Sequence, residues 1–287
     1  GQEHLSEAAA GMQAVAPLSL RVNRQKTSVE SLVTRLTEGE GARCVVSAVY
    51  PWAIDVASLG SPEHSQSFAD GLWTVQDQAA QLIGAMAQAE EGWQVLDACA
   101  GVGGKTTHLA ELPLKLRIDA VDLSKRKISL LNDSVKRLGL EGISPHVADA
   151  TRDDAKLASD YDLVMLDAPC SGLGVLRRHP EAKWGPDKRP RIVEIVALQS
   201  KLLDAVAKRV KPGGILLYSV CTFTSSEGPE QVADFLARHP EFEMAPPTAN
   251  SEHEPDWSGL LSEDGSFTSW PHVRAQDAFY AARMRRR

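Results

Sequence analysis

Residues Asp160–Gly172 read DYDLVMLDAPCSG, and the rest of the chain is best interpreted outward from this stretch. The apolar run Leu163–Leu166 predicts a strand buried on both faces, which is typical of a parallel sheet covered by helices. The strand ends in Asp167 and Cys170, and ligands of open α/β sheets bind beyond the carboxyl ends of the strands. Pro169 restricts the backbone, so the loop is expected to be stiff. Taken alone, a buried structural cysteine is the simpler interpretation.

The composition is that of an ordinary globular protein. The chain has 287 residues, enough for one large domain or two smaller ones. No apolar run is long enough for a transmembrane helix and no signal-peptide pattern is present, so we expect a cytoplasmic protein without a membrane partner. Residue 1 is Gly rather than Met, which suggests a fragment of a longer protein. The formal net charge of −7 argues against a uniformly basic surface for nucleic acid, although it allows a local basic groove.

The four cysteines form no C-x-x-C motif, so a metal site is not expected. A chain of this size needs no disulfides, which favours a reducing compartment. The cysteines are Cys44, Cys99, Cys170 and Cys221.

The chain divides into three parts. Residues 1–16 are small and polar and are interpreted as a linker or a truncated N-terminal region. Residues 17–75 predict a small α+β module, with strands at 18–22, 45–49 and 53–56 and a helix at 28–37. Residues 76–287 alternate between helix and strand, which predicts an α/β domain with a largely parallel sheet. Its expected strands are 94–98, 118–122, 144–148, 162–166, 214–220 and a final edge strand at 279–283, and its expected helices are 76–89, 105–111, 124–138, 191–210 and 227–238.

A glycine-rich turn follows the first of these strands and reads CAGVGGK over residues 99–105. A P-loop would need glycine at position 99, and a dinucleotide fingerprint would need glycine at position 106. Neither is present. An acidic strand residue, Asp97, followed by Gly101 and Gly103 is instead the arrangement of S-adenosylmethionine-dependent methyltransferases. Glycine lets the backbone approach a ligand closely and adopt positive φ.

Two further strands end in acidic residues. Asp122 could accept hydrogen bonds from both ribose hydroxyls of a nucleoside, and Asp149 could meet an adenine edge. A helix N-cap is the simpler role for either residue alone. Together with Asp97 and the glycine turn, they indicate a nucleoside-containing cofactor.

The strand expected at 214–220 also ends in a cysteine, Cys221. If this strand neighbours the one at 162–166, Cys221 and Cys170 lie close together beside the inferred methyl donor. Two such thiols suggest covalent catalysis at carbon-5 of a pyrimidine. That carbon becomes nucleophilic only after a thiolate adds to carbon-6, and a base must later remove the carbon-5 proton.

These motifs resemble the Sun/Fmu-type RNA cytosine-5 methyltransferases, also called the NOL1/NOP2/Sun group. The resemblance runs from about residue 18 to the C-terminus. It implies a Rossmann-like S-adenosylmethionine methyltransferase sheet, a small RNA-recognition-like N-terminal module, and methyl transfer to carbon-5 of a cytosine in RNA, with bacterial 16S rRNA as the expected substrate. The motifs that carry it are LSLRVN at 18–23, VQD at 75–77, LDACAGVGGKT at 96–106, DAPCSGLG at 167–174, HPEAKW at 179–184 and YSVCTFTSSE at 218–227.

The resemblance also implies roles for individual residues. Cys221 is implied as the nucleophile that attacks carbon-6, and Cys170 as the base that assists proton removal and release. Asp167 would contact the cytosine and lie near the methyl donor, and Lys105 would hold the active-site loops in place. The implied cofactor-binding residues are Cys99, Ala100, Gly101, Val102, Gly103, Gly104, Lys105, Asp122, Asp149 and Asp167.

Contacts to the RNA backbone are expected from Arg21, Asn23, Arg24 and the loop at 177–183. Trp184 could stack on a base, although a buried tryptophan is the commoner case. Two other functions stay open: methylation of a transfer RNA, and a catalytically weak RNA-binding factor in ribosome assembly. The second rests on departures from the family motif, namely Val220 before the cysteine and the sequence EGPE at 227–230 after it. The sequence carries no signature of an oligomeric state.

Overall fold

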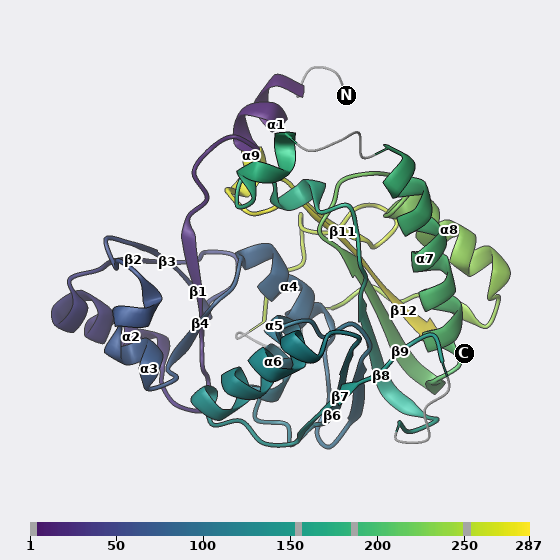
Figure 1. The fold of residues 1–287 in the computed structure, drawn as a ribbon, viewed down its shortest axis with the longest axis horizontal. Helices are drawn as coiled ribbons and strands as arrows, with labels where there is room; N and C mark the ends of the chain where they lie inside the picture. The colour runs from purple at the N-terminus through teal and green to yellow at the C-terminus, as the bar shows by residue number, and fades with distance from the viewer. Residues whose placement is uncertain (1–4, 153–156, 185–188, 249–253) are drawn as a thin grey trace.

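The computed structural model describes residues 5–152, 157–184, 189–248 and 254–287. Within them the chain forms two sheets that lie side by side (Figure 1). The first has four strands and is built from the N-terminal quarter of the chain. The second has eight strands, and the residues expected to take part in catalysis or cofactor binding lie at its strand ends or in the loops and helices that follow them.

The first sheet is antiparallel throughout, with the strand order β2-β3-β1-β4. Its core is formed by buried apolar side chains that include Leu20, Leu32, Ile54 and Trp73. The helix expected at 28–37 is capped by Ser28 and continues as a π-helix after its first six residues. The strands expected at 18–22 and 53–56 and the helix are present, and the strand expected at 45–49 lies earlier, at 43–46. The strand β4 was not predicted, because three residues are too few to show a period. The elements are β1 (Leu18–Val22), α2 (Val29–Thr34), a π-helix (Arg35–Gly39), β2 (Arg43–Val46), β3 (Ala53–Ala57), a 3₁₀ helix (Pro62–His64), α3 (Gln66–Ala69) and β4 (Trp73–Val75).

The second sheet has the order β10-β12-β9-β8-β5-β6-β7, with β11 paired to β12. The five strands from β9 to β7 are parallel, so their carboxyl ends meet at one edge of the sheet. The Rossmann-like α/β class that the sequence predicted is therefore confirmed. The strands are β5 (Gln94–Asp97), β6 (Arg117–Asp122), β7 (Ile143–Val147), β8 (Tyr161–Asp167), β9 (Val210–Val220), β10 (Phe242–Met244), β11 (Phe267–Ser269) and β12 (Phe279–Arg286).

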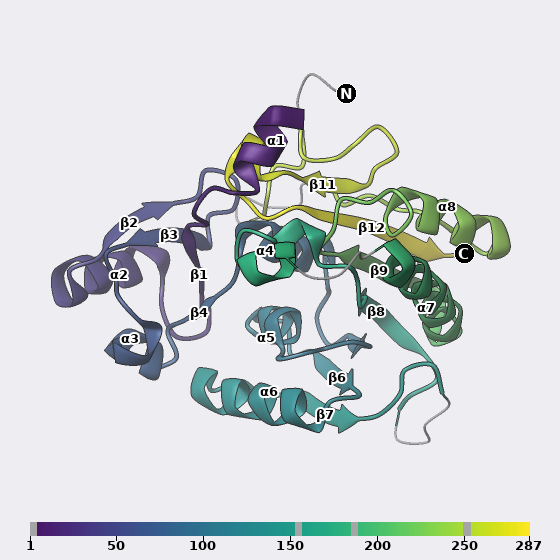
Figure 2. The same cartoon turned by 45° about the horizontal axis from the view of Figure 1, so that its top comes forward.

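Helices cover both faces of this sheet (Figure 2). Along β8, Leu163 and Met165 face the cluster that α4 and α5 complete, and Val164 and Leu166 face the cluster of α7 and α8. Alternate strand residues point to opposite faces, which explains why this strand is apolar throughout. The helices are α4 (Gln78–Met86), α5 (Gly104–Ala110), α6 (Lys125–Leu138), α7 (Arg189–Ala207) and α8 (Pro229–Arg238).

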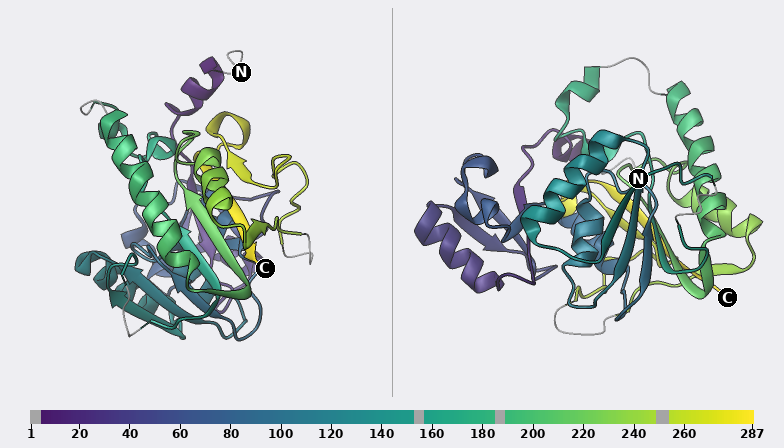
Figure 3. Two further views of the ribbon diagram at one scale, coloured as in Figure 1. Left: turned by 90° about the vertical axis from the view of Figure 1, so that its right-hand side faces the viewer. Right: turned by 60° about the horizontal axis from the view of Figure 1, so that its bottom comes forward.

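The expectation that residues 279–283 form an edge strand is wrong. β12 runs antiparallel between β9 and β10, and its residues Phe279–Met284 are buried. A strand near the end of a chain can insert into the interior of a sheet, and its apolar run is the sequence sign that it does so. Outside the sheets, α1 (Leu5–Gly11) packs against α9 (Pro271–Arg274), at the end of the molecule where the described chain begins (Figure 3).

The two sheets are joined by buried polar contacts. The Arg21 guanidinium on β1 forms an ion pair with Glu111, with Nε 2.7 Å from Oε2, and donates to the Gln76 side chain at 2.6 Å. Asn23 donates to the backbone oxygens of Gly71 and Leu138. Both side chains are almost completely buried, so the expectation that they contact RNA is wrong. The division of the chain into domains at residues 75 and 76 stays a prediction.

Candidate active site

Two thiols meet at the carboxyl edge of the large sheet. β8 and β9 are parallel neighbours with Asp167 opposite Ser219, so the loops that follow them start side by side. The Sγ atoms of Cys170 and Cys221 are 3.1 Å apart. The hydrogen bond from the Cys221 thiol lowers the pKa of Cys170. The same bond, together with burial, raises the pKa of Cys221. Of the two thiols, Cys170 is therefore the one that loses its proton more readily.

An ion pair lies beside the thiols. Lys105 on α5 donates from Nζ to Oδ2 of Asp167 at 2.6 Å, and Ser219 donates to the other carboxylate oxygen at 2.7 Å. The Lys105 side chain is 7% exposed and its ammonium lies 5.5 Å from the Phe279 ring centroid. The Asp167 side chain is 35% exposed and can still reach a ligand. Sequence reasoning named Lys105 and Asp167, but it missed Ser219, which lies inside an apolar strand.

A buried carboxylate holds the two cysteine loops together. Glu227 is completely buried and accepts a hydrogen bond from the backbone N–H of Ser171 at 2.8 Å. It also accepts from the hydroxyl of Thr224 at 2.8 Å and from the Gln199 amide at 3.2 Å. Gln199 donates in turn to the carbonyl of Pro169. The sequence placed Glu227 in a motif without a role, because the loop it supports precedes it by more than fifty residues.

The glycine turn leaves open space on one side. Gly101 has φ +59, and a Cβ built on it would meet no atom within 4 Å. Gly103 has φ +88, and a Cβ there would lie 2.1 Å from Leu131 on α6. Both positions favour glycine by backbone conformation, but only the first faces a place where a ligand could approach. Beyond it, Val102 is half exposed.

The acidic strand ends lie in different environments. Burial raises the pKa of Asp97 to about 7. Its Oδ2 accepts from Thr106, and no described residue donates to its buried Oδ1. Asp122 accepts from the backbone N–H groups of Gly101 and Ser124, and Ser124 rather than Asp122 caps α6.

Asp149 lies two residues beyond the end of β7. Its carboxylate accepts from the backbone and hydroxyl of Thr151, which lower its pKa. This carboxylate is therefore engaged in a local turn. Cys99 is half-buried and Ala100 is buried at the start of the glycine turn, and burial raises the pKa of the Cys99 thiol.

The structure contradicts part of the expectation that the loop at 177–183 contacts RNA. Arg177 is only 2% exposed at its side chain and pairs with Asp277 at 2.5 Å, so its guanidinium is unavailable to RNA. Arg178 pairs with Asp77 and Asp277. Trp184 is 88% exposed, so the alternative of a buried tryptophan is wrong.

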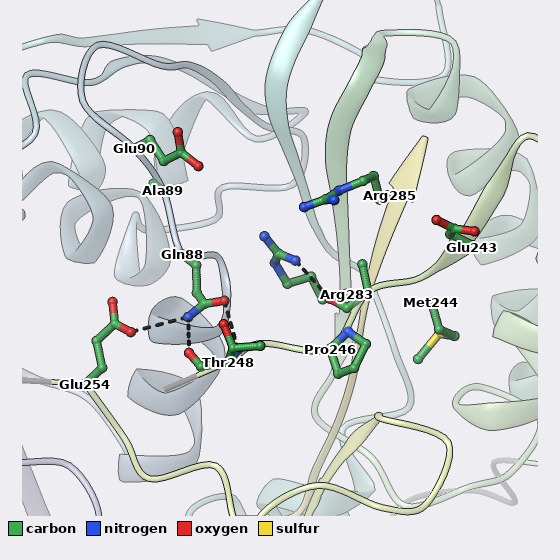
Figure 4. Close-up of a pocket in the computed structure, with 11 residues that line it drawn as sticks. Gln88, Ala89, Glu90, Glu243, Met244, Pro246, Thr248, Glu254, Arg283 and Arg285 are labelled. Atoms are coloured by element: carbon green, nitrogen blue, oxygen red, sulfur yellow. Dashed lines mark hydrogen bonds between the residues drawn. The ribbon is translucent and has the colours of Figure 1, made fainter. Parts of the chain in front are cut away.

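A separate hollow lies at the opposite edge of the sheet (Figure 4). It has a volume of about 460 Å³, and the guanidinium groups of Arg283 and Arg285 extend into it from the last part of β12. Because β12 is antiparallel to β9 and Arg285 pairs with Ile215, this hollow is remote from Cys221. Burial lowers the pKa of Arg283 to about 10. Three glutamates also line the hollow: Glu90, Glu243 and Glu254. Their negative charges offset those of the two arginines, so the hollow is not a clear anion site.

The parallel sheet, the glycine turn and the paired thiols together define a Rossmann-like α/β protein with two neighbouring thiols beyond the strand ends. No metal site made of three or more His, Cys, Asp or Glu side chains is found among the described residues. Nor does any helix in that part of the chain have both the length and the apolar character needed to cross a membrane.

Comparison with known proteins agrees with this class. Residues 84–285 match the family model of 16S rRNA methyltransferase RsmB/F. Over 258 residues the chain is 36% identical to ribosomal RNA small subunit methyltransferase B of Klebsiella pneumoniae. The aligned part covers 88% of this chain and 58% of that protein. The solved structure of PH0851 is 31% identical with a TM-score of 0.89, covering 98% of this chain and 62% of that one. A methyltransferase homolog protein from Pyrococcus horikoshii shares the fold at 24% identity, with a TM-score of 0.83 and coverage of 99% and 91%.

The chain belongs to the 16S rRNA methyltransferase RsmB/F family. This confirms the family resemblance that the sequence motifs indicated. The chain spans less than two thirds of the length of the curated relative it matches.

Proposed function

We propose that this protein transfers a methyl group from S-adenosylmethionine to carbon-5 of a cytosine in RNA, with 16S rRNA as the substrate. The observation that carries the proposal is the 3.1 Å approach of the Cys170 and Cys221 sulfur atoms beside Asp167 and Lys105. A carbon-5 transfer needs one nucleophile and one base within reach of the same ring, and this pair can supply both.

The residues around the glycine turn fit the proposed methyl donor. The open side of Gly101 gives the donor a place against the backbone, and the buried Oδ1 of Asp97 lacks the hydrogen bond that an ammonium group would donate. Asp122 has lone pairs left for ribose hydroxyls, because each of its oxygens accepts one backbone bond. When bound, the donor supplies an electrophilic methyl group on a sulfonium. Cys99, Ala100, Val102, Gly103, Gly104, Lys105 and Asp149 complete the proposed binding surface.

The first chemical step uses the difference in pKa between the two thiols. The Cys221 sulfur adds to carbon-6 of the cytosine while its proton passes to the Cys170 thiolate, 3.1 Å away. A sulfur–carbon bond forms, and the electron pair of the carbon-5 to carbon-6 double bond becomes available at carbon-5 for methylation. Asp167, held by Lys105 and Ser219, orients the ring.

The second step releases the product. Cys170 first gives its proton to solvent and then, as a thiolate, removes the proton from methylated carbon-5. The double bond re-forms and the Cys221 thiolate leaves. One methyl cation has then entered the ring and one proton has left it. Glu227 holds both cysteine loops in register during this exchange, because it is bonded to Ser171 on one loop and Thr224 on the other.

The target base must leave its stack to reach these thiols. The small N-terminal sheet is proposed to contact the RNA around the target. With Arg21, Asn23 and Arg177 buried, the remaining candidates for RNA contact are Arg24, whose guanidinium lies 4.3 Å from the Trp52 ring centroid, the rest of the loop at 177–183, and the exposed Trp184.

The test is a methyl-transfer assay with labelled S-adenosylmethionine and unmethylated 16S rRNA. Wild type and Cys44→Ala, a control thiol on β2, are expected to be active, whereas Cys221→Ala and Cys170→Ala are expected to be inactive. Cys170→Ala should also accumulate a protein–RNA adduct that survives denaturation. Without the Cys170 bond that raises its pKa, Cys221 can lose its proton to solvent and add to the ring, but no base remains to release it.

Full activity of Cys221→Ala would exclude the covalent mechanism. A wild-type protein that methylates transfer RNA and not 16S rRNA would change the substrate. Binding of RNA and methyl donor without turnover would instead support a role in ribosome assembly.

A further inference from the structure

A pocket separate from the thiol pair opens on the loop that follows Cys221. It has a volume of about 310 Å³ and lies between residues 222–225 and the turn that leads into β11. Neither the proposed methyl-donor site nor the proposed target cytosine uses it. Its walls combine two features that recur in nucleobase sites: aromatic faces and hydrogen-bonding groups.

The aromatic wall is made by Phe223 and Trp270. Their ring centroids are 5.4 Å apart and the planes are inclined by 33°. Phe223 is 40% exposed, although it is only two residues from the proposed nucleophile. Phe223 therefore presents part of its ring to the pocket, where a planar ligand could stack on it.

Polar side chains make up another wall of the pocket. Asp264 accepts from the backbone N–H and the hydroxyl of Ser266 at a single oxygen, Oδ1. No described residue donates to its other oxygen, which is thus available to an N–H group of a ligand. Hydroxyl-bearing side chains supply further donors and acceptors around the pocket: Thr222, Thr224, Ser225, Ser262, Ser266, Thr268 and Tyr280.

The pocket is connected to the thiol pair by the loops that follow Cys170 and Cys221. Thr222 lines it and is bonded by its hydroxyl to Ser171, the residue after Cys170, at 3.0 Å. Tyr280 lies opposite Val220 in the pairing of β12 with β9, whereas its neighbour Phe279 lies beside Lys105. β12 therefore contributes one aromatic ring to each site from adjacent residues, which point to opposite faces of the strand.

We propose that this pocket binds the nucleobase of a nucleotide that flanks the target cytosine. The inference rests on the proposed RNA methyltransferase function and deepens it. The base stacks on Phe223, and an N–H group on its edge donates to Asp264. The phosphate stays outside, because the Asp264 carboxylate repels it. Holding one flanking base here, while the target base enters beside Cys170 and Cys221, would keep the RNA strand splayed during the reaction.

The first test measures binding without turnover. A fluorescein-labelled single-stranded oligo(A) is titrated with the full chain, and its anisotropy is followed. Phe223→Leu, which keeps apolar bulk but removes the ring face, is expected to weaken binding by about 5- to 100-fold. Phe223→Tyr should bind like wild type, and so should Leu130→Ala, a comparably exposed apolar residue on α6. Equal affinities for wild type and Phe223→Leu would overturn the proposal.

The second test separates this pocket from the proposed function. An unmethylated 16S rRNA fragment that contains the target cytosine is prepared with an abasic site at each flanking position in turn. At the flanking position whose base occupies the pocket, the abasic site should lower the kcat/KM of wild type by about 5- to 100-fold. The same abasic site should lower the kcat/KM of Phe223→Leu little further, because that variant has already lost the stacking contact. Independent, additive losses would exclude the pocket while leaving the methyltransferase proposal intact. A wild type that methylates no fragment would instead contradict the proposed function, and the oligo(A) titration would still decide the pocket.

Asp264→Asn gives a separate check on the polar wall. Asparagine keeps the oxygen to which Ser266 is bonded but replaces the free oxygen by an NH₂ donor. Its preference should shift from oligo(A) towards oligo(U), whose base offers carbonyl acceptors on its edge. An unchanged preference would exclude Asp264 as the reader of the base.

Discussion

The sulfur atoms of Cys170 and Cys221 lie 3.1 Å apart although the two residues are 51 positions apart in the chain. The approach follows from the parallel pairing of β8 with β9, which starts both loops at the same edge of the sheet. Two thiols at this distance, one of them with a lowered pKa, are poised for oxidation as well as for catalysis.

Mild hydrogen peroxide should therefore inactivate the protein reversibly. The Cys170 thiolate attacks one peroxide oxygen and hydroxide leaves, which gives a sulfenic acid. Cys221 then displaces water from this sulfur and a disulfide forms. Peptide mass spectrometry should find these two residues joined with the loss of two hydrogen atoms, and dithiothreitol should restore methyl transfer. Oxidation of Cys44 in preference to this pair would contradict the expectation.

Glu227 is expected to be a positioning residue. Glu227→Ala removes the acceptor shared by Ser171, Thr224 and Gln199, so both cysteine loops lose their common support. A displacement of about 1 Å can cost 10²-fold in rate, and we expect kcat to fall by about 10- to 100-fold. Glu227→Gln should recover most of kcat because it keeps an acceptor. Binding of the methyl donor, measured by calorimetry, should change little in either variant, and a loss confined to donor binding would contradict this role.

The ion pair of Arg21 with Glu111 should contribute to stability rather than to RNA binding. Arg21→Met leaves the Glu111 carboxylate buried without its cation, which we expect to cost about 3–5 kcal/mol in the free energy of unfolding measured with urea. The double variant Arg21→Met with Glu111→Leu should recover much of that loss.

Lys115→Met is the matched control for this pair. It removes an exposed ion pair with Glu91 and should cost about 0–1 kcal/mol. If Arg21→Met left stability unchanged but weakened RNA binding, Arg21 would be an RNA contact after all.

Asp97 should make stability depend on pH. Its pKa in the folded protein, about 7, lies above the value near 4 of an unfolded aspartate. The folded state therefore binds the proton more tightly, so this group stabilises the fold least at high pH, and its contribution is lost as pH rises from about 4 to about 7. Asp97→Asn should be more stable than wild type at pH 8, by up to about 4 kcal/mol for a pKa of about 7 in the folded protein and about 4 in the unfolded chain, and the difference should shrink towards pH 5.

Urea unfolding of both proteins across this pH range measures that difference directly. A difference that does not vary with pH would show that Asp97 is not buried with a raised pKa. The same variant should bind the methyl donor more weakly, since the neutral amide lacks the charge proposed to attract its ammonium group.

Local sequence determined most of the secondary structure and the identity of the candidate catalytic groups. The apolar run before Asp167, the glycine turn at 99–104 and the two cysteines at strand ends are local patterns, because strand periodicity and backbone conformation depend on near neighbours. Parallel strands of this class also share one functional edge, so the sequence could indicate that Cys170 and Cys221 would meet.

The tertiary structure decided which polar groups are available and which are buried. Arg21, Asn23 and Arg177 looked like RNA contacts, yet each is engaged with partners distant in the chain. Glu227 and Ser219 gained roles only through loops and strands brought beside them, and β12 entered the sheet interior only through pairing with both β9 and β10. The burial of a charge depends on its long-range partners and on packing, and neither has a period that a single sequence displays.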